Sequence, residues 1–423
     1  MSARPPAAPA RNLTDVPTIP VGSPLLLLGR GSDPATERGV LCPGDLPAPD
    51  DPNLRDRARA ARAALGDDVM VLGHHYQRDQ VIDFADARGD SFELSRQAAA
   101  AQAPFIVFCG VHFMAESASI LGREDQRVIL PDLAAGCSMA DMAEAHQVVD
   151  AWARFERAGV SDATVPLTYM NSTAGIKAFC DEHGGAICTS SNAPRAMQWA
   201  FDQVDASDPT LPAKVLFLPD QHLGRNTAVL SLGLDLADCV VYDPWRADGG
   251  LTDDQLRAAR VILWKGHCSV HARFQPAMVA KVRDELPGVQ VLVHPECRHE
   301  VVLEADRVGS TGQIIRWVED APAGSTLAIA TELNLVKRLG EQHPDKHVVF
   351  LDDTVCFCAT MNRIDLPHLV WVLESLVEGE VVNEIRVAPD VRRNALLALE
   401  RMLSLPGTGQ SLAAVAGAAV AVV

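Results

Sequence analysis

The sequence of 423 residues lacks long apolar runs, a secretory signal and an excess of positive charge. Because no run of 18 apolar residues occurs, we expect no membrane-spanning helix of ordinary length. Leu25–Leu28 is only a four-leucine run between proline and glycine, too short for the apolar segment of a signal peptide. The 37 basic and 55 acidic residues give a formal charge of −18, the wrong sign for a general nucleic-acid binder. These absences predict a soluble, cytoplasmic protein with neither a nucleic-acid nor a membrane partner.

The paired-cysteine motifs of zinc ribbons and ferredoxins are also missing, because no CxxC…CxxC spacing occurs. Ten cysteines without an export signal argue against a disulfide framework and favour a metal site or a reactive thiol. Four of them lie within or beside apolar stretches and are expected to be small buried hydrophobic residues: Cys109, Cys180, Cys188 and Cys239.

Aromatic side chains make up only 5% of the chain, so alanine, valine and leucine are expected to fill the core. The hydrophobic and charged fractions, 48% and 22%, are close to globular averages and rule out a disordered or fibrous chain. At about 150 residues per domain, the length predicts roughly three domains. From Asn53 onward, strand-like apolar runs alternate with polar loops and alanine-rich helical patterns. This alternation predicts an α/β fold, with parallel sheets that carry helices on both faces.

The apolar runs end in three kinds of polar loop, which recur in the same order three times. The first kind carries two polar side chains one residue apart: His74 and Tyr76, Tyr169 and Asn171, His294 and Glu296. The second is a small loop with hydroxyl groups that opens a helix: Gly89–Ser91, Thr189–Asn192 and Gly309–Gly312. The third ends in a cysteine: Cys137, Cys268 and Cys358. This order predicts an internal triplication, with the middle unit enlarged around Asp202–Ala213 and Asp235–Arg257.

The three cysteine loops predict a metal site if the units meet around a pseudo-threefold axis, because each unit then delivers one thiol to the same place. An iron–sulfur cluster on three thiolates would leave one iron open as a Lewis acid. Zinc on three thiolates is the competing interpretation, and buried cysteines at strand ends are the plainest one. Cys356 could replace Cys358 as the ligand or link to it on oxidation, and Cys297 is expected to be a core or reserve thiol.

The other two kinds of loop supply groups for anion binding and proton transfer. Ser91, Ser190, Ser310 and Thr311 stand where helices are expected to begin, and free backbone N–H groups there suit carboxylates or phosphate. Ordinary helix capping is the plainer alternative for any single loop. Five side chains of the first kind of loop could carry protons, namely His74, Tyr76, Tyr169, His294 and Glu296. Asn171 could orient a carbonyl or carboxylate group, and His75 is expected to point away from the site.

Motifs from all three units resemble those of the quinolinate synthase family, in the same order from Leu54 to Glu400. They are His74–Gln77, Gly89–Ser91, Gly136–Ala140, Tyr169–Ser172, Cys188–Asn192, Trp264–His271, Val293–Cys297, Gly309–Gly312 and Cys358–Asn362. The resemblance implies three similar αβα domains, Rossmann-like with short parallel sheets, around a pseudo-threefold axis. The active site would lie at their junction and hold a [4Fe–4S] cluster. The N-terminal extension and the enlarged middle unit fit a longer form of the family.

The resemblance implies a role for each matching residue. The cluster ligands would be Cys137, Cys268 and Cys358, the last preferred because the family ligand precedes a methionine by three residues, as Met361 does here. The implied substrate contacts are His74, Ser91, Tyr169, Asn171, Ser190, His294, Glu296, Ser310 and Thr311. Tyr76 and Glu296 would act in acid–base steps with His294 as a helper.

The implied reaction condenses iminoaspartate with dihydroxyacetone phosphate to quinolinate, with release of phosphate and two waters, in the de novo biosynthesis of NAD. Such an enzyme would be a transferase that also dehydrates its substrates. Iminoaspartate is unstable in water, so an aspartate oxidase or dehydrogenase is expected to supply it. An iron–sulfur sensor without turnover and a structural zinc protein remain alternatives, although the polar side chains beside the thiols favour catalysis.

We predict six segments along the chain. They are a mobile N-terminal extension (1–52), a first α/β domain (53–142), a second α/β domain with an insertion (143–270), a third α/β domain (271–358), C-terminal helices that pack back on the core (359–405) and a flexible tail (406–423).

Overall fold

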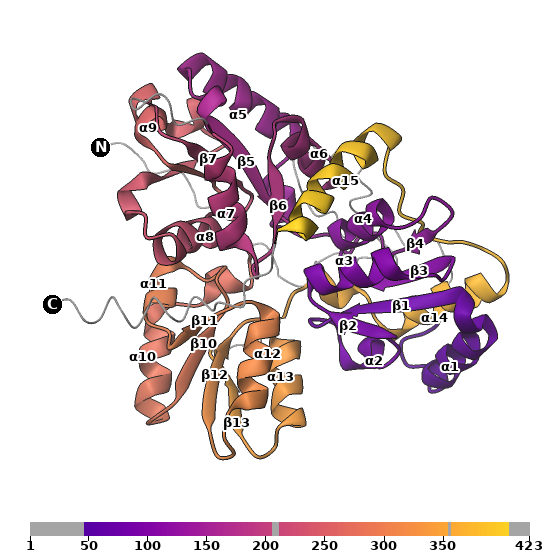
Figure 1. Ribbon diagram of the computed structural model, residues 1–423. Coiled ribbons are helices and arrows are strands. Elements are labelled where there is room, and N and C mark those ends of the chain that lie inside the picture. The colour runs from indigo at the N-terminus through magenta and orange to yellow at the C-terminus, as the bar shows by residue number, and fades with distance from the viewer. Residues whose placement is uncertain (1–45, 205–210, 354–356, 406–423) are drawn as a thin grey trace, which may run out of the picture.

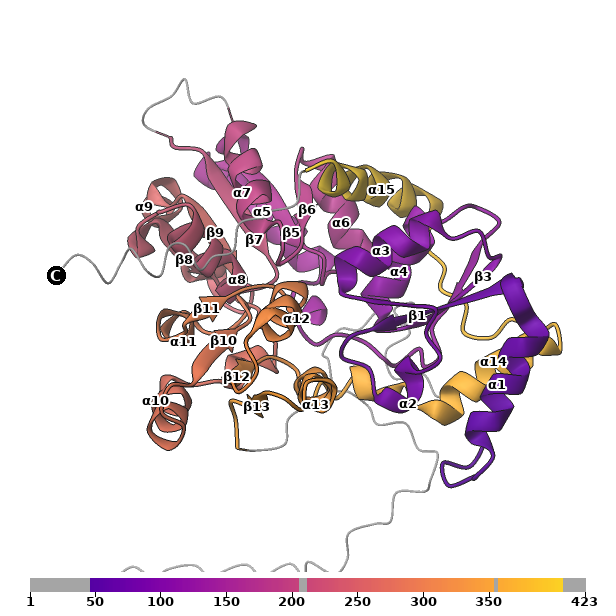
Figure 2. The ribbon, with the colours of Figure 1, turned by 60° about the horizontal axis from the view of Figure 1, so that its bottom comes forward.

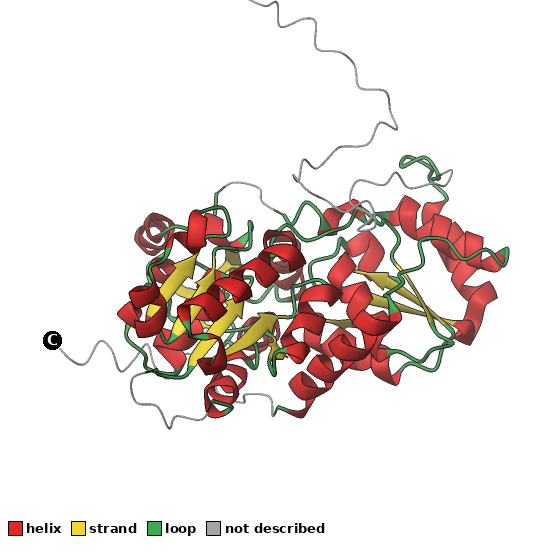
Figure 3. Ribbon diagram, turned by 90° about the horizontal axis from the view of Figure 1, so that it is seen from above, coloured by secondary structure: helices red, strands yellow, loops and turns green. Residues whose placement is uncertain are grey.

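The computed structural model describes residues 46–204, 211–353 and 357–405, which form three separate parallel sheets flanked by helices (Figure 1). Helices cover the strands on both sides, as the view from above shows (Figure 3). The predicted α/β fold of three αβα units is therefore confirmed. No helix among the described residues has both the length and the apolar character needed to cross a membrane.

The first sheet has the strand order β2-β1-β3-β4. Its strands are β1 (Val69–His74), β2 (Ala87–Gly89), β3 (Phe105–Cys109) and β4 (Arg127–Ile129). The helices of this unit are α1 (Leu54–Leu65), α2 (Asp79–Ile82), α3 (Ser91–Ala100) and α4 (His112–Leu121). The continuous apolar runs of β1 and β3 are buried because helices cover both faces of the sheet.

The second sheet has five strands in the order β6-β5-β7-β9-β8. They are β5 (Thr164–Tyr169), β6 (Ala186–Cys188), β7 (Lys214–Leu218), β8 (Cys239–Tyr242) and β9 (Val261–Trp264). Its helices are α5 (Ala145–Ala158), α6 (Ala174–Glu182), α7 (Ala193–Asp202), α8 (Gln221–Asn226) and α9 (Asp253–Ala258). The additional edge strand β8 and helix α9 come from the segment predicted as the second insertion, whereas the first predicted insertion includes residues 205–210, outside the described ranges.

The third sheet repeats the order of the first, as β11-β10-β12-β13. Its strands are β10 (Gln290–Val293), β11 (Arg307–Val308), β12 (Thr326–Ala330) and β13 (His347–Phe350). Its helices are α10 (Pro276–Glu285), α11 (His299–Leu303), α12 (Thr311–Asp320) and α13 (Leu333–Gln342). All strand pairs in the three sheets are parallel, so the carboxyl ends of the strands in each sheet lie at one edge.

Two C-terminal helices return to the first two units. Helix α14 (Leu366–Val377) packs against α1, and α15 (Pro389–Ser404) packs against α6 and α4 (Figure 1). Their apolar side chains belong to the same core cluster as the first sheet. The domain boundaries predicted from the sequence stay predictions, and most of the N-terminal extension (residues 1–45) and the tail (406–423) lie outside the described residues.

Candidate active site

Loops from all three units line one cavity. Figure 2 shows the three units grouped around a common centre. Its lining includes nine of the predicted polar residues and all three predicted ligands: His74, Tyr76, Ser91, Tyr169, Asn171, Ser190, His294, Glu296, Thr311, Cys137, Cys268 and Cys358. Two of the three tyrosines in the sequence are among them. The fold therefore gathers into one place residues that lie far apart in the chain.

Three residues that the sequence analysis discussed near the site do not line this cavity: Ser310, His75 and Cys297. Ser310 is the N-cap of α12, and its backbone N–H donates to Gln313 Oε1 (2.9 Å), so its role as a substrate contact stays a prediction. His75 is also not part of the lining, in line with the expectation that it points away. Cys297 is fully buried with its thiol 3.7 Å from the Ala330 carbonyl oxygen, which fits a core thiol.

The same short turn follows each of the three cysteines that line the cavity. The carbonyl oxygens of Cys137, Cys268 and Cys358 accept hydrogen bonds from the backbone N–H groups four residues later, at 3.0, 2.9 and 3.0 Å. A 3₁₀ turn begins three residues after each cysteine, at Ala140, His271 and Met361. Equivalent turns supply equivalent thiols, which supports Cys358 as the third ligand. Cys356 lies outside the described residues.

The environment of the thiols is costly for uncompensated negative charge. Burial raises the pKa of Cys137 to about 12 and that of Cys268 well above its usual value. The three sulfurs are close enough that Cys358 raises the pKa of both of the others. A cationic metal centre would offset this penalty, because thiolates and not thiols are the metal ligands. The donor set therefore fits a metal cofactor.

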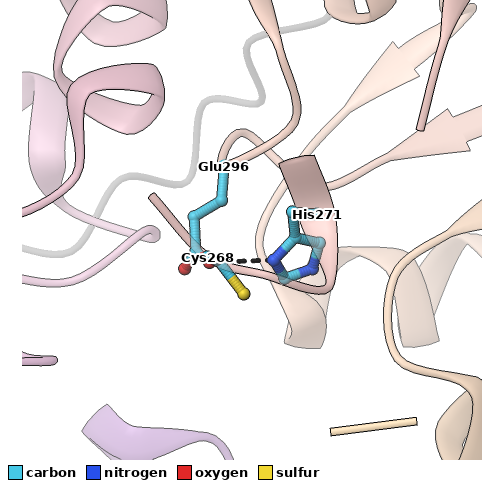
Figure 4. A group of neighbouring side chains, drawn as sticks. All are labelled: Cys268, His271 and Glu296. Carbon is cyan, nitrogen blue, oxygen red and sulfur yellow. Dashed lines mark hydrogen bonds and ion pairs between the residues drawn. The ribbon is translucent and has the colours of Figure 1, made fainter. Parts of the chain in front are cut away.

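One cluster of metal-binding side chains stands out at the cavity wall. The thiol of Cys268, the ring of His271 and the carboxylate of Glu296 offer ligand atoms that all lie within 4.8 Å of one another. Figure 4 shows the three side chains turned toward one another, with His271 Nδ1 hydrogen-bonded to Glu296 Oε2 at 2.8 Å. The rings of His271 and His294 stack at 4.4 Å between centroids, so His271 is packed on one side and hydrogen-bonded on the other.

The loops after β1 and β10 have matching local geometry. His74 Nδ1 accepts a hydrogen bond from the Tyr76 backbone N–H (3.1 Å), and His294 Nδ1 accepts one from the Glu296 N–H (3.4 Å). Each histidine therefore carries its ring proton on Nε2 when it is neutral. Burial lowers the pKa of both histidines to about 3, so both rings are neutral at neutral pH.

Tyr76 and Glu296, which follow His74 and His294 by two residues in these loops, differ in charge. Burial raises the pKa of Tyr76 well above its usual value, despite hydrogen bonds to Thr311 (2.9 Å) and Thr331 (2.8 Å), so Tyr76 is a neutral proton donor. Burial also acts to raise the pKa of Glu296, but His271, which is hydrogen-bonded to the carboxylate, outweighs it and lowers that pKa below the usual range. Glu296 is therefore an ionised carboxylate, suited to accept a proton.

The loop after β5 provides one unused acceptor. Asn171 Oδ1 is buried and has no hydrogen-bond partner among the described residues. A buried amide oxygen without a partner is unfavourable unless a ligand or water satisfies it, so this atom is available to a donor group on a ligand. Tyr169, two residues earlier, interacts through its hydroxyl with Glu296 and Ser190, which joins the second and third units across the cavity.

Neighbouring units hold the loops after β1 and β10 in place. Arg338, on α13 of the third unit, donates to the carbonyl oxygens of His75 (2.8 Å) and Gln77 (2.6 Å) and to Asp79 Oδ1 (2.6 Å). Asn226, on α8 of the second unit, donates from Nδ2 to the matching carbonyl oxygens of the third unit, those of Pro295 (2.8 Å) and Cys297 (2.9 Å). The loop carrying Tyr76 and the loop carrying Glu296 are thus both fixed from outside their own unit.

Most backbone N–H groups at the helix N-termini beside the cavity already have partners. Asp90 caps α3, with Oδ1 accepting from the backbone N–H groups of Phe92 and Glu93, both at 3.0 Å. Helix α7 has no side-chain hydrogen bond at its N-cap, and Ser190 lies just before its start. At the start of α7 the Ala193 N–H donates to the Thr189 carbonyl oxygen (2.9 Å) and Pro194 has no N–H, so an anion finds few free N–H groups at either helix.

Sequence reasoning missed four residues that shape this site: His271, Thr331, Arg338 and Asn226. His271 stands three residues after Cys268 in a motif that was already noted, and its place in the 3₁₀ turn carries the signal. Thr331 directly follows the apolar run of β12, a strand end whose next residues were not considered. Arg338 and Asn226 lie in helices away from the motifs, and their contacts with other units depend on tertiary structure.

Comparisons with known proteins agree with the geometry of the site. Residues 58–404 match the sequence profile of the family described as Quinolinate synthetase A protein. The chain is 66% identical over 385 residues to a quinolinate synthase from a Nocardioides species, an alignment that covers 91% of this chain and 97% of that relative. It is 64% identical over 395 residues to the quinolinate synthase of Streptomyces coelicolor, covering 93% and 98%. The quinolinate synthase of Acidobacterium capsulatum is 55% identical over 360 residues, covering 84% and 94%. A match of this extent shows that the chain belongs to the quinolinate synthase family.

Proposed function

We propose that this member of the family acts in NAD biosynthesis and condenses iminoaspartate with dihydroxyacetone phosphate to quinolinate. The reaction releases one phosphate and two waters, so no external oxidant is required. One carbon–nitrogen and one carbon–carbon bond close the pyridine ring. The enzyme is then a transferase in which proton transfers accompany the loss of phosphate and water.

The cofactor in this proposal is a [4Fe–4S] cluster held by Cys137, Cys268 and Cys358. Three thiols from three units, each set in the same turn and facing one cavity, support this assignment. A cluster with three protein ligands leaves one iron open, which supplies Lewis-acid polarisation of a substrate oxygen. The side chains around the thiols bind and orient the substrates.

Neutral polar groups would hold the substrate anions despite the charge of −18 on the chain. Ser190, Ser91 and Thr311 offer hydroxyl donors for the phosphate. The neutral rings of His74 and His294 can donate from Nε2 to carboxylate or carbonyl oxygens. Asn171 Oδ1 can accept from a substrate hydroxyl or imine N–H group.

Tyr76 and Glu296 are the proposed acid and base, with His294 as a helper. The carboxylate of Glu296 would take a proton from a substrate carbon or hydroxyl, since neighbouring groups keep it ionised. The neutral hydroxyl of Tyr76 would give a proton to a departing oxygen. Apolar side chains, including Val111, Phe113 and Met114, form the remaining wall and keep bulk water away from these steps.

The main support for the proposal is that three equivalent thiols, the hydroxyl of Tyr76 and the carboxylate of Glu296 line one cavity. An iron–sulfur sensor would need the thiols but not this polar lining. A structural zinc protein remains a specific alternative, because the donor set Cys268, His271 and Glu296 also suits zinc. Zinc in that arrangement would occupy the proposed base, and turnover would be lost.

Anaerobic purification followed by an assay separates these functions. We expect a brown protein with iron and sulfide bound, which forms quinolinate when given dihydroxyacetone phosphate and freshly generated iminoaspartate. Quinolinate is identified by mass spectrometry against an authentic standard. A colourless protein with one zinc per chain would contradict the cluster, and a brown protein without quinolinate formation would favour a sensor. Since iminoaspartate hydrolyses, we also propose functional coupling to an aspartate oxidase or dehydrogenase, which can generate it in the assay.

A further inference from the structure

The three 3₁₀ turns that follow the proposed cysteine ligands are joined to one another in a ring. Each turn ends five residues after its cysteine, at Met142, Arg273 or Arg363. Each of these three residues contacts the segment that leads to the cysteine of the next unit. The first unit thus contacts the second, the second contacts the third, and the third contacts the first.

Two of the three contacts are ion pairs between an arginine and a buried aspartate. Arg273 Nη2 is 3.0 Å from Asp352 Oδ2, which follows β13 of the third unit. Arg363 Nε is 2.8 Å from Asp132 Oδ2, which follows β4 of the first unit. The aspartate side chains are only 4% and 1% exposed, so water cannot readily replace the arginine at either carboxylate.

A second arginine, from the next unit, also holds each of these two turns. Arg298 Nε, in the loop after β10, donates to the Ala272 carbonyl oxygen (2.7 Å). Arg78 Nη2, in the loop after β1, donates to the Asn362 carbonyl oxygen (2.7 Å). The N–H groups of Ala272 and Asn362 are those that donate to the carbonyl oxygens of the cysteines. Each of these arginines therefore contacts the residue that closes a cysteine turn.

Neutral groups hold the turn of the first unit instead. The carbonyl oxygen of Met142 accepts from Trp264 Nε1 (2.6 Å), and its sulfur accepts from the His267 N–H (3.4 Å). Trp264 is fully buried at the end of β9, so apolar packing accompanies this contact. In this ring, charged contacts join the third unit to both of its neighbours, and neutral contacts join the first unit to the second.

We propose that Arg273 and Arg363 are positioning residues that hold the turns after Cys268 and Cys358 in place around the cofactor. A binding site whose parts are already fixed loses less conformational freedom when its ligand binds, so it retains the ligand better. The inference rests on the proposed function, because it concerns the cofactor assigned there. It adds two residues that do not line the cavity.

Arg273→Met and Arg363→Met test this role, since methionine is long and unbranched but cannot pair with an aspartate. Anaerobically purified protein is mixed with a ferrous chelator that absorbs light once it binds iron, and iron release is followed over time. We expect release about tenfold faster than from the wild type in each variant, because a buried carboxylate loses its charged partner. Arg363→Lys keeps the charge without the planar geometry of arginine and should release iron at an intermediate rate.

Arg283→Met is the matched control. Arg283 pairs with Asp306 (3.2 Å) inside the third unit, and its side chain is 40% exposed, close to the 42% of Arg273. Iron release from this variant should stay within about twofold of wild type, because exposed ion pairs contribute little. Circular dichroism recorded during release shows whether the protein is still folded when iron leaves. We expect the signal to stay unchanged in the Arg273→Met and Arg363→Met proteins.

The outcomes distinguish this inference from the proposed function. If both methionine variants release iron at the wild-type rate, the positioning role is wrong. If iron leaves only as the circular dichroism signal is lost, the arginines support the fold and not the site, and the inference also fails. A folded variant purified without iron, beside a control that holds it, supports the inference. If Arg363→Met does not fold, Arg363→Lys is measured in its place. If the wild-type protein binds no iron, the proposed cofactor has failed and this inference fails with it.

Discussion

The first and third units share one backbone framework but present different side chains to the cavity. In both, a carboxylate after the second helix of the unit accepts from the backbone of the central strand: Asp86 from Val71 N–H and Asp306 from Val291 N–H, each at 2.7 Å. In both, a histidine ring accepts from the N–H group two residues on. The framework then presents a neutral tyrosine in one unit and an ionised glutamate in the other. A repeated fold can thus place an acid and a base in one cavity by a change at a single position.

The units should be equivalent at their thiols, and loss of any one thiol should have the largest effect. Cys137→Ser, Cys268→Ser and Cys358→Ser are each expected to lose the cluster and all activity, because each thiol occupies the same turn in its unit. Iron and sulfide content and the visible absorbance of anaerobically purified protein measure this. Cys239→Ser, at a half-buried cysteine of the second sheet, is the matched control and should keep the cluster. Cys356→Ser should keep it as well, and a cluster-free Cys356→Ser protein would reverse the choice of Cys358.

The next largest effects are expected at Tyr76 and Glu296, which follow His74 and His294 by two residues in the loops after β1 and β10. Glu296→Gln and Tyr76→Phe should each lower kcat by about 10²- to 10⁴-fold with the cluster retained, as is typical for loss of a general base or acid. Single-turnover formation of quinolinate by the loaded enzyme is the measurement. Full activity of Glu296→Gln would refute its assignment as the base. His75→Gln, in the same loop as Tyr76 but outside the cavity, is the control and should stay within about threefold of wild type.

The two contacts that hold these loops from neighbouring units should differ in strength. Arg338→Met removes three hydrogen bonds, one of them to a carboxylate, whereas Asn226→Leu removes three neutral ones, the third between Asn226 Oδ1 and His299 Nδ1 (2.8 Å). Because each variant leaves buried carbonyl oxygens without a donor, we expect losses of about 3 kcal/mol and 2 kcal/mol in the free energy of unfolding. Denaturant unfolding of the two variants checks this order.

The Arg338→Met and Asn226→Leu variants should also differ in turnover. Arg338→Met should lower kcat more than Asn226→Leu does, since Arg338 holds the Tyr76 loop by an ion pair with Asp79 as well as by both carbonyl groups that flank Tyr76. Arg338→Lys keeps the charge but cannot reach all three acceptors at once, and an intermediate kcat is expected. Equal kcat values for the methionine and wild-type proteins would mean that the loop keeps its shape without Arg338.

The smallest effects are expected at Asp86 and Asp306, the carboxylates that accept from β1 and β10 in the first and third units. Asp86→Asn and Asp306→Asn each weaken a hydrogen bond from a carboxylate to a strand N–H group, and Asp86 and Asp306 each also pair with an arginine. Both variants should lose about 1 kcal/mol of stability with little change in kcat. Thermal unfolding of the two proteins side by side is sufficient. A large difference between them would show that the two units depend on this contact to different extents.

Much of the fold could be predicted because its signals are local. The apolar runs of β5, β7 and β9 are continuous, as buried parallel strands require, and the polar residues that follow strands in the three units line one cavity. The repeated order of the three kinds of polar loop was enough to predict three similar units from the sequence. The edge strand β8 was less visible, because it is short and only half-buried and lies in a segment read as an insertion.

The parts of the site that escaped prediction depend on contacts between units. Thr331 and Arg338 carry no periodic or motif signal, and their partners lie about 250 residues away in sequence at Tyr76, His75 and Gln77. The relation between His271 and Glu296 likewise appears only when two loops from different sheets meet. The sequence also does not show that Asp90 turns back to cap α3 and takes up two of its N–H groups.

The contact between Arg338 and the loop of the first unit bears on how the protein is made. A chain leaves the ribosome from its N-terminus, so the first unit is synthesised long before α13, which holds its loop. The last of the three thiols emerges later still, followed by α14 and α15, which tie the chain end to the first two units. The cavity is thus completed only when synthesis is nearly finished, and the proposed cofactor would be inserted late.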